Sequence, residues 1–209
     1  MDHTNNQSTV IRILSIVSPL TLLMVWEVSS RMQIIDTRLF SSPSLIFHAS
    51  IPLLTSGELL FNTAVSIQRV LAGFCAGALP GIILGMAMGL SPHMRSAIEP
   101  MIAATYPIPK LAIMPLILLV FGLGETSKIF TIAIGVFYLV VINTMAGVLN
   151  IEKIYLDVAK NFGASRKNFY LTVAFPGALP MIFAGLKLGM GMALILIVAA
   201  ELSAAKAGV

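Results

Sequence analysis

The sequence predicts an all-α integral membrane protein with about five transmembrane helices, on the basis of three observations. Hydrophobic residues make up 57% of the 209 residues and only 11% are charged, whereas a soluble domain carries about 25% charged residues. The mean hydropathy is +0.95. Apolar stretches long enough to cross a bilayer recur along the chain, separated by polar segments. We therefore expect a multi-pass protein in contact with membrane lipid.

Composition also narrows the possible functions. The single cysteine, Cys75, excludes a disulfide framework and a cysteine metal site. The three histidines are scattered, so we expect no metal site and no membrane-embedded enzyme, which would need clustered ligands or a nucleophile–base pair. Although the net charge is +4, basic residues cluster in one loop only. No nucleic-acid partner is therefore expected.

Residues 10–56 are expected to form the first transmembrane helix and an external connection. The apolar stretch runs from Val10 to Val28. The polar residues 1–9 before it are expected to be a short disordered tail. The connection is mixed in polarity, with one surface helix expected near residues 43–54.

The second span, Thr63–Leu90, carries glycines at every fourth position, so they line one helix face. These glycines are Gly73, Gly77, Gly81, Gly85 and Gly89. Such a face lets a neighbouring backbone approach closely, and close packing drives helix association in lipid. We therefore expect a helix-packing surface here. Arg69, near the start of the span, is expected to extend its charged end to the membrane surface.

Residues 100–124 depart from the pattern of a regular span. The stretch contains Pro100, Pro107, Pro109 and Pro115, together with the charged Lys110. Irregular backbone at membrane depth is tolerated only where protein or a water-filled cavity satisfies it. A broken span of this kind is a candidate element of a translocation pathway, with Lys110 as a candidate residue.

Two further spans are expected at Ile129–Ile151 and Ala178–Ala200. The second contains Lys187, and Glu201 follows it directly. A charge inside a span costs about 2.5–3.5 kcal/mol on insertion scales, so Lys187 is a functional candidate. Two roles remain open for Lys187, which are electrostatic guidance of an anion along a pathway and an intramembrane salt bridge.

Residues 155–180 form an amphipathic loop between these two spans. We expect helices over residues 155–162 and 166–175 that meet at a corner. Gly163 suits a left-handed helix end because it has no Cβ. Ser165 can cap the second helix, which is expected to run until Pro176 forces the chain back into the membrane.

This loop resembles the EAA loop of ABC importer permeases, whose pattern is Glu-Ala-Ala, three residues, Gly, nine residues and Ile-x-Leu-Pro. The match comprises Asp157-Val158-Ala159, Gly163 and Val173-Ala174-Phe175-Pro176. Asp157, Val158 and Phe175 depart mildly from it. In that family the loop docks on a separate ATPase subunit. The alternative is an amphipathic loop lying on the membrane surface.

Other stretches resemble the permease branch that serves nitrate, sulfonate, taurine or bicarbonate importers. They are Ile108–Leu116, Phe121–Lys128, Gly185–Gly189 and Ala200-Glu201. The resemblance implies a MetI-like type I ABC importer permease fold over residues 57–209 with a cytoplasmic coupling helix pair. The coupling residues that it implies are Asp157, Val158, Ala159, Phe162, Gly163, Ala164, Ser165 and Pro176. The fold normally has one more helix, so the chain is expected to be a fragment or a natural truncation.

The implied function is the permease subunit of an ATP-driven importer of a small solute, such as one of these anions. The implied partners are an ABC ATPase subunit, a solute-binding protein and a second permease, identical or paired. ATP would bind to the ATPase subunit, so we expect no cofactor and no enzymatic activity in this chain. The implied location is the inner membrane, with residues 1–9 and 152–175 cytoplasmic. A secondary transporter or channel subunit is the alternative function.

Overall fold

A computed structural model describes residues 2–205 of the chain, and every regular element within that range is a helix. Met1 and residues 206–209 lie outside the described residues. The prediction that the fold's last helix is missing concerns the carboxyl-terminal end of the chain, which also lies outside them. The chain divides into two compact units, residues 1–64 and 65–209. Four helices in the described part are long and apolar enough to cross a membrane. About five spans had been predicted, and the broken stretch accounts for the difference.

The first unit contains helices α1 (Asp2–Arg31) and α2 (Pro43–Thr55). The helix begins at Asp2, so the prediction of a disordered tail is wrong for residues 2–9. Each residue added to the end of an existing helix gains one backbone hydrogen bond without a new nucleation step, so the span continues as a helix. The predicted surface helix near residues 43–54 is confirmed by α2, which starts at a Ser42 cap.

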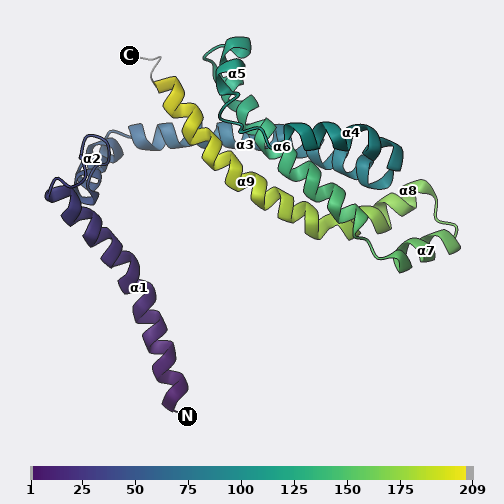
Figure 1. The fold of residues 1–209 in the computed structure, drawn as a ribbon, viewed down its shortest axis with the longest axis horizontal. Coiled ribbons are helices and arrows are strands. Elements are labelled where there is room, and N and C mark those ends of the chain that lie inside the picture. Colours follow the sequence, from purple (N-terminus) through teal and green to yellow (C-terminus); the bar gives the residue numbers. More distant parts are fainter. Residues whose placement is uncertain (1, 206–209) are drawn as a thin grey trace. The chain divides into compact units, whose positions relative to one another are not determined.

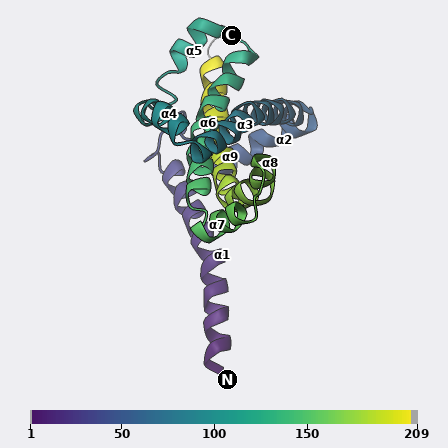
Figure 2. The ribbon, with the colours of Figure 1, turned by 90° about the vertical axis from the view of Figure 1, so that its right-hand side faces the viewer.

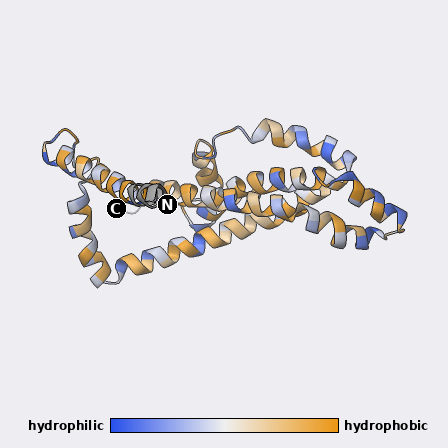
Figure 3. Ribbon diagram, turned by 90° about the horizontal axis from the view of Figure 1, so that it is seen from below, coloured by the Kyte–Doolittle hydropathy of each residue, from blue (hydrophilic) through white to orange (hydrophobic). Residues whose placement is uncertain are grey.

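Three helices form the core of the second unit: α3 (Glu58–Leu90), α6 (Glu125–Leu149) and α9 (Phe175–Ala205). Figures 1 and 2 show α6 and α9 running side by side. Their shared core includes Val136, Val140, Ala193 and Leu196, none of them more than 1% exposed. Both helices consist mostly of apolar residues, as expected for spans (Figure 3).

The broken stretch forms two separate helices, α4 (Pro92–Thr105) and α5 (Met114–Phe121). Ser91 caps α4, with its hydroxyl accepting from the Met94 N–H. Pro107 and Pro109 lie in the connection, where they donate no backbone hydrogen bond that could continue the helix. Neither helix is long enough to count among the candidate spans.

The polar loop contains α7 (Lys153–Asn161) and α8 (Arg166–Phe169), followed by a π-helix, η1 (Tyr170–Ala174), which leads into α9. The prediction that the second helix stops at Pro176 is wrong, because the helical path is continuous through this residue. The Phe175 N–H donates to the Tyr170 carbonyl, five residues back. This wider turn accommodates a proline whose ring would clash with the preceding turn of a regular α-helix.

Candidate functional site

The corner between α7 and α8 is a glycine-terminated helix end. Gly163 has φ +65°, so its predicted left-handed conformation is confirmed. Its N–H donates to the Lys160 carbonyl at 3.1 Å, and the Ala164 N–H donates to the Ala159 carbonyl at 3.0 Å. This pair of bonds is the Schellman motif, which satisfies carbonyls that the helix end leaves free. The direction in which the chain leaves α7 is therefore set by local hydrogen bonds.

Ser165 begins the second helix of the corner. Its hydroxyl accepts from the Asn168 N–H at 3.3 Å, as predicted for a cap. Because η1 joins α8 to α9 without a break, the corner is linked directly to a membrane span. A displacement of α8 would therefore be transmitted to α9.

The outer surface of α7 presents apolar side chains. Ile154, Val158 and Phe162 follow at four-residue intervals and are 62%, 49% and 87% exposed, so they share one face. Figure 3 shows hydrophilic colours gathered at the corner beside this face. An apolar face bordered by charged residues is typical of a protein contact surface. We call these three residues the α7 face.

The predicted coupling residues do not all point outward. Those that are exposed are Asp157, Val158, Phe162, Gly163, Ala164, Ser165 and Pro176. Ala159 is only 8% exposed and packs inside the chain. The sequence had suggested that Ala159 and Phe162 both face a partner, and the structure supports that orientation for Phe162 alone. Ala159 directly follows Val158, so its side chain points about 100° away from that of Val158 on the α7 face.

Lys110 is occupied by its own chain. Its Nζ donates to the carbonyls of Thr105, Tyr106 and Ile108 at 3.1, 3.0 and 2.9 Å. An ammonium has three donors, so all are used. The Nζ also lies 4.2 Å from the ring centroid of Tyr138, whose hydroxyl donates to Thr105. These contacts describe a brace for the end of α4, and they leave no donor for a solute.

Lys187 has the opposite surroundings. It is exposed in the middle of α9 and forms no hydrogen bond or ion pair within the described part of the chain. Glu201 lies 14 residues further along the same helix, about 21 Å away at 1.5 Å per residue. The structure therefore does not bring Lys110, Lys187 and Glu201 together as one pathway constellation.

Glu201 instead belongs to an ion-pair network that sequence reasoning missed. Arg69 binds both carboxylate oxygens of Glu125, with Nε–Oε2 and Nη2–Oε1 distances of 2.5 and 2.6 Å. Its Nη1 donates to Glu201 at 2.8 Å, and Ser66 donates to the same oxygen at 2.6 Å. Arg69 was expected to extend toward the membrane surface rather than to bind another residue, and its two carboxylate partners contradict that expectation. These partners hold Arg69 between the helices.

The glycine row of α3 lies against α6. A Cβ added to Gly73 would come within 2.6 Å of the Ile132 side chain, and one on Gly85 would come within 2.7 Å of the Val141 carbonyl. Cβ positions built on Gly77, Gly81 and Gly89 meet α6 as well. Because these distances leave no room for a side chain, the two backbones approach more closely here than larger residues would allow.

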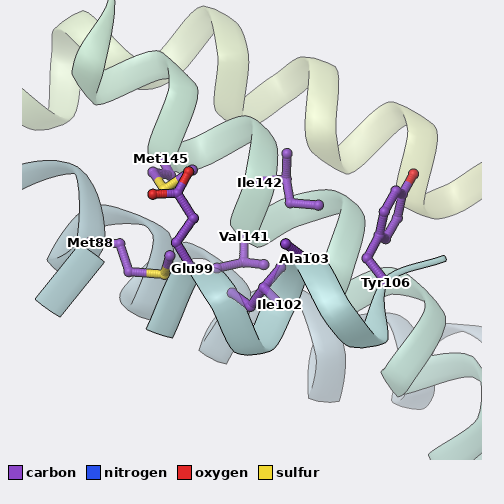
Figure 4. A pocket seen from close by; sticks show the side chains of 8 residues that line it. All are labelled: Met88, Glu99, Ile102, Ala103, Tyr106, Val141, Ile142 and Met145. Atoms are coloured by element: carbon purple, nitrogen blue, oxygen red, sulfur yellow. The ribbon is translucent and has the colours of Figure 1, made fainter. Parts of the chain in front are cut away.

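A cavity of about 190 Å³ lies between α3, α4 and α6 (Figure 4). It is lined by Met88, Glu99, Ile102, Ala103, Tyr106, Val141, Ile142 and Met145. Glu99 is the one charged residue among those that Figure 4 labels, and the exposed lining is almost entirely apolar. A carboxylate disfavours an anion, and no set of polar donors converges there. This cavity is therefore a poor site for an anionic solute.

Comparisons with known proteins agree on one family. The family model described as "Binding-protein-dependent transport system inner membrane component" matches residues 81–209. The taurine transport system permease protein TauC of Escherichia coli is 36% identical over 200 residues, which cover 93% of this chain and 73% of TauC. The putative aliphatic sulfonates transport permease protein SsuC of E. coli is 33% identical, over 91% of this chain and 73% of SsuC. The nitrate import permease protein NrtB of Synechococcus elongatus is 36% identical, over 74% of this chain and 56% of NrtB.

Proposed function

This chain belongs to the family of binding-protein-dependent transport system inner membrane components, and we propose that it moves a small anion through the membrane half of an ATP-driven importer. As a permease component it is not itself catalytic, and a system of this kind implies an ATPase and a binding protein as partners. Two permease chains, identical or paired, would together form the pathway.

The α7–α8 corner is the element that we assign to the ATPase contact. The observation that supports this most directly is the α7 face, where Phe162 is 87% exposed on a loop that also carries Lys160, Arg166 and Lys167. Apolar anchors surrounded by charge are typical of a docking surface between proteins.

The proposed topology follows from this contact. An ATPase partner is cytoplasmic, so residues 152–175 lie on the cytoplasmic side, and the amino terminus lies there too. Arg12, Arg95 and Lys153 then face the cytoplasm, as the positive-inside rule favours. The amino-terminal end of α6, opposite the loop, faces outward.

A small oxyanion is the solute class that we propose. Relatives at similar levels of identity are named for taurine, aliphatic sulfonates and nitrate, all of which carry an oxyanion group or are one. Lys187 is the residue that we assign to the pathway, because it is an exposed cation without a partner in the described part of a span.

In the proposed mechanism of alternating access, closure of the ATPase dimer displaces the corner between α7 and α8, and η1 transmits this displacement to α9.

The ATPase contact is tested by Phe162→Ala. The protein would be co-expressed with a candidate ABC ATPase subunit and purified through a tag on the permease. We expect the amount of co-purified ATPase to fall about tenfold or more, because central aromatic residues dominate such interfaces. The matched control is Phe61→Ala, which removes another exposed phenylalanine (69%) near the start of α3, outside the α7 face. Equal ATPase recovery from both variants would contradict the assignment.

A further inference from the structure

Three spans meet in the ion-pair network around Arg69. Arg69 and Ser66 come from α3, Glu125 and Lys128 from α6, and Glu201 from α9. The two cations and two carboxylates balance in charge. Charged residues more than fifty positions apart in the sequence thus pair with one another at one end of the helix core.

The two links made by Arg69 differ in strength. Glu125 is held by two hydrogen bonds in the paired geometry that suits a guanidinium and a carboxylate, whereas Glu201 receives one bond from Arg69 and one from the neutral Ser66 hydroxyl. Lys128 lies 3.6 Å from Glu125 and adds a second cation there. Glu125 also stands in the first turn of α6, where the helix dipole favours a negative charge. The link from α3 to α6 is therefore stabilised by the paired hydrogen bonds, by Lys128 and by the helix dipole.

Backbone packing is closest between α3 and α6. The glycine row holds these two helices together over residues 73–89, so the Arg69–Glu125 pair joins helices that are already in close contact. Val70, next to Arg69, also packs in one core cluster with Leu196 and Ile197 of α9. The Arg69–Glu201 pair is an ionic contact between α3 and α9, made by one hydrogen bond from the guanidinium. Breaking this single guanidinium bond costs less than breaking the paired bonds to Glu125, so this link is the easier of the two to open.

The network and the α7–α8 corner lie at opposite ends of the core. Glu125 begins α6, whereas the corner follows its last residue, and α6 has 25 residues, or about 37 Å of helix. Figure 1 shows α7 and α8 at the far end of α6 and α9 from the end at which α9 stops. A contact at this end can therefore respond to movement at the corner only through the helices themselves.

We propose that Arg69 is a positioning residue, and that its link to Glu201 is a releasable clasp between α3 and α9. The bidentate link to Glu125 keeps the guanidinium in place while the clasp opens and closes. The role of this opening in transport rests on the proposed function, under which this end faces outward and must open to receive solute. The clasp itself is a property of the chain alone.

The clasp is tested by a distance measurement between α3 and α9. Spin labels would be attached to cysteines at Leu71 and Val198, both exposed, in a Cys75→Ser background of the full chain in lipid nanodiscs. We expect Glu201→Gln to add a population at longer distance, raising the open fraction about fivefold, the effect of about 1 kcal/mol. Glu125→Gln should leave the distribution unchanged, because packing with α6 and the remaining Arg69–Glu201 pair persist. Arg69→Lys should be intermediate, since a lysine keeps the charge without the fork.

Glu58→Gln is the matched control, since it neutralises an exposed carboxylate near the start of α3. An unchanged distribution in Glu201→Gln, or equal broadening in Glu125→Gln, would overturn the clasp. In a complex with the ATPase, Glu201→Gln should also raise ATP hydrolysis without solute about fivefold. If no ATPase binds the parent protein, the proposed function fails, whereas the distance measurement still decides whether the clasp exists.

Discussion

At the scale of single residues, Gly163 illustrates how backbone conformation alone can determine a site. A Cβ built on Gly163 would meet nothing within 4 Å, so no packing requirement explains a glycine there. The requirement is its φ of +65°, which strains any residue with a Cβ. Lys110 is the converse case, a charged residue whose contacts give it a structural role that its charge alone did not reveal.

Gly163→Val is therefore expected to strain the corner without a steric clash. The left-handed conformation costs a β-branched residue about 1–2 kcal/mol or more, which would shift α7 and the α7 face. The variant should reach the membrane at near-normal levels yet lose most solute-stimulated ATP hydrolysis in the reconstituted complex. Gly124→Val is the control, because a Cβ there also meets open space but φ is −86°. Unchanged hydrolysis in Gly163→Val would remove the corner from coupling.

At the scale of helices, the α3–α6 pair depends on small residues at regular spacing. Gly81 lies against Val140, and an added Cβ would come within 3.0 Å of that side chain. Lipid supplies no hydrophobic force between helices, so close backbone packing is the main source of their association. The corner between α7 and α8 depends instead on hydrogen bonds within the loop. Span packing and corner geometry can therefore be disturbed separately.

Gly81→Leu should separate α3 from α6 and reduce the yield of folded protein. Its side chain would have to displace Val140, whose neighbours are fully packed, and overpacking costs about 1–3 kcal/mol or more. The measurement is the fraction of monodisperse protein in detergent and its melting temperature. Gly191→Leu is the control, because a Cβ on Gly191 meets nothing within 4 Å. Normal yield and stability for Gly81→Leu would contradict the packing role.

At the scale of the whole chain, the sequence predicted what local patterns determine. Apolar runs indicated the spans, and glycine and serine chemistry indicated the corner. The Arg69 network was missed because it joins residues on three spans, and no local pattern pairs Arg69 with Glu125 and Glu201. The inward position of Ala159 and the continuous path through Pro176 were missed for a similar reason. Both depend on how the loop joins α9.

Lys187 is the charged residue of α9 on which the proposed pathway depends. It is exposed and unpaired within the described residues, and a lysine facing lipid at mid-span would be unfavourable by about 2.5–3.5 kcal/mol. That cost is avoided if Lys187 faces a wet pathway shared with a second permease chain. A lysine there attracts anions, so Lys187→Ala should lower uptake of taurine or nitrate about tenfold, or about 1.4 kcal/mol in barrier.

The uptake measurement uses proteoliposomes that contain the complete complex, and ATPase recovery serves as the assembly readout. Lys187→Arg should retain most uptake because it keeps the positive charge, and Leu188→Ala controls for truncation of a neighbouring exposed side chain (54%). If Lys187→Ala abolished assembly along with uptake, the lysine would be a structural partner of another chain. If uptake were unchanged, Lys187 would lie outside the pathway, and the anion would have to be guided by residues on other helices.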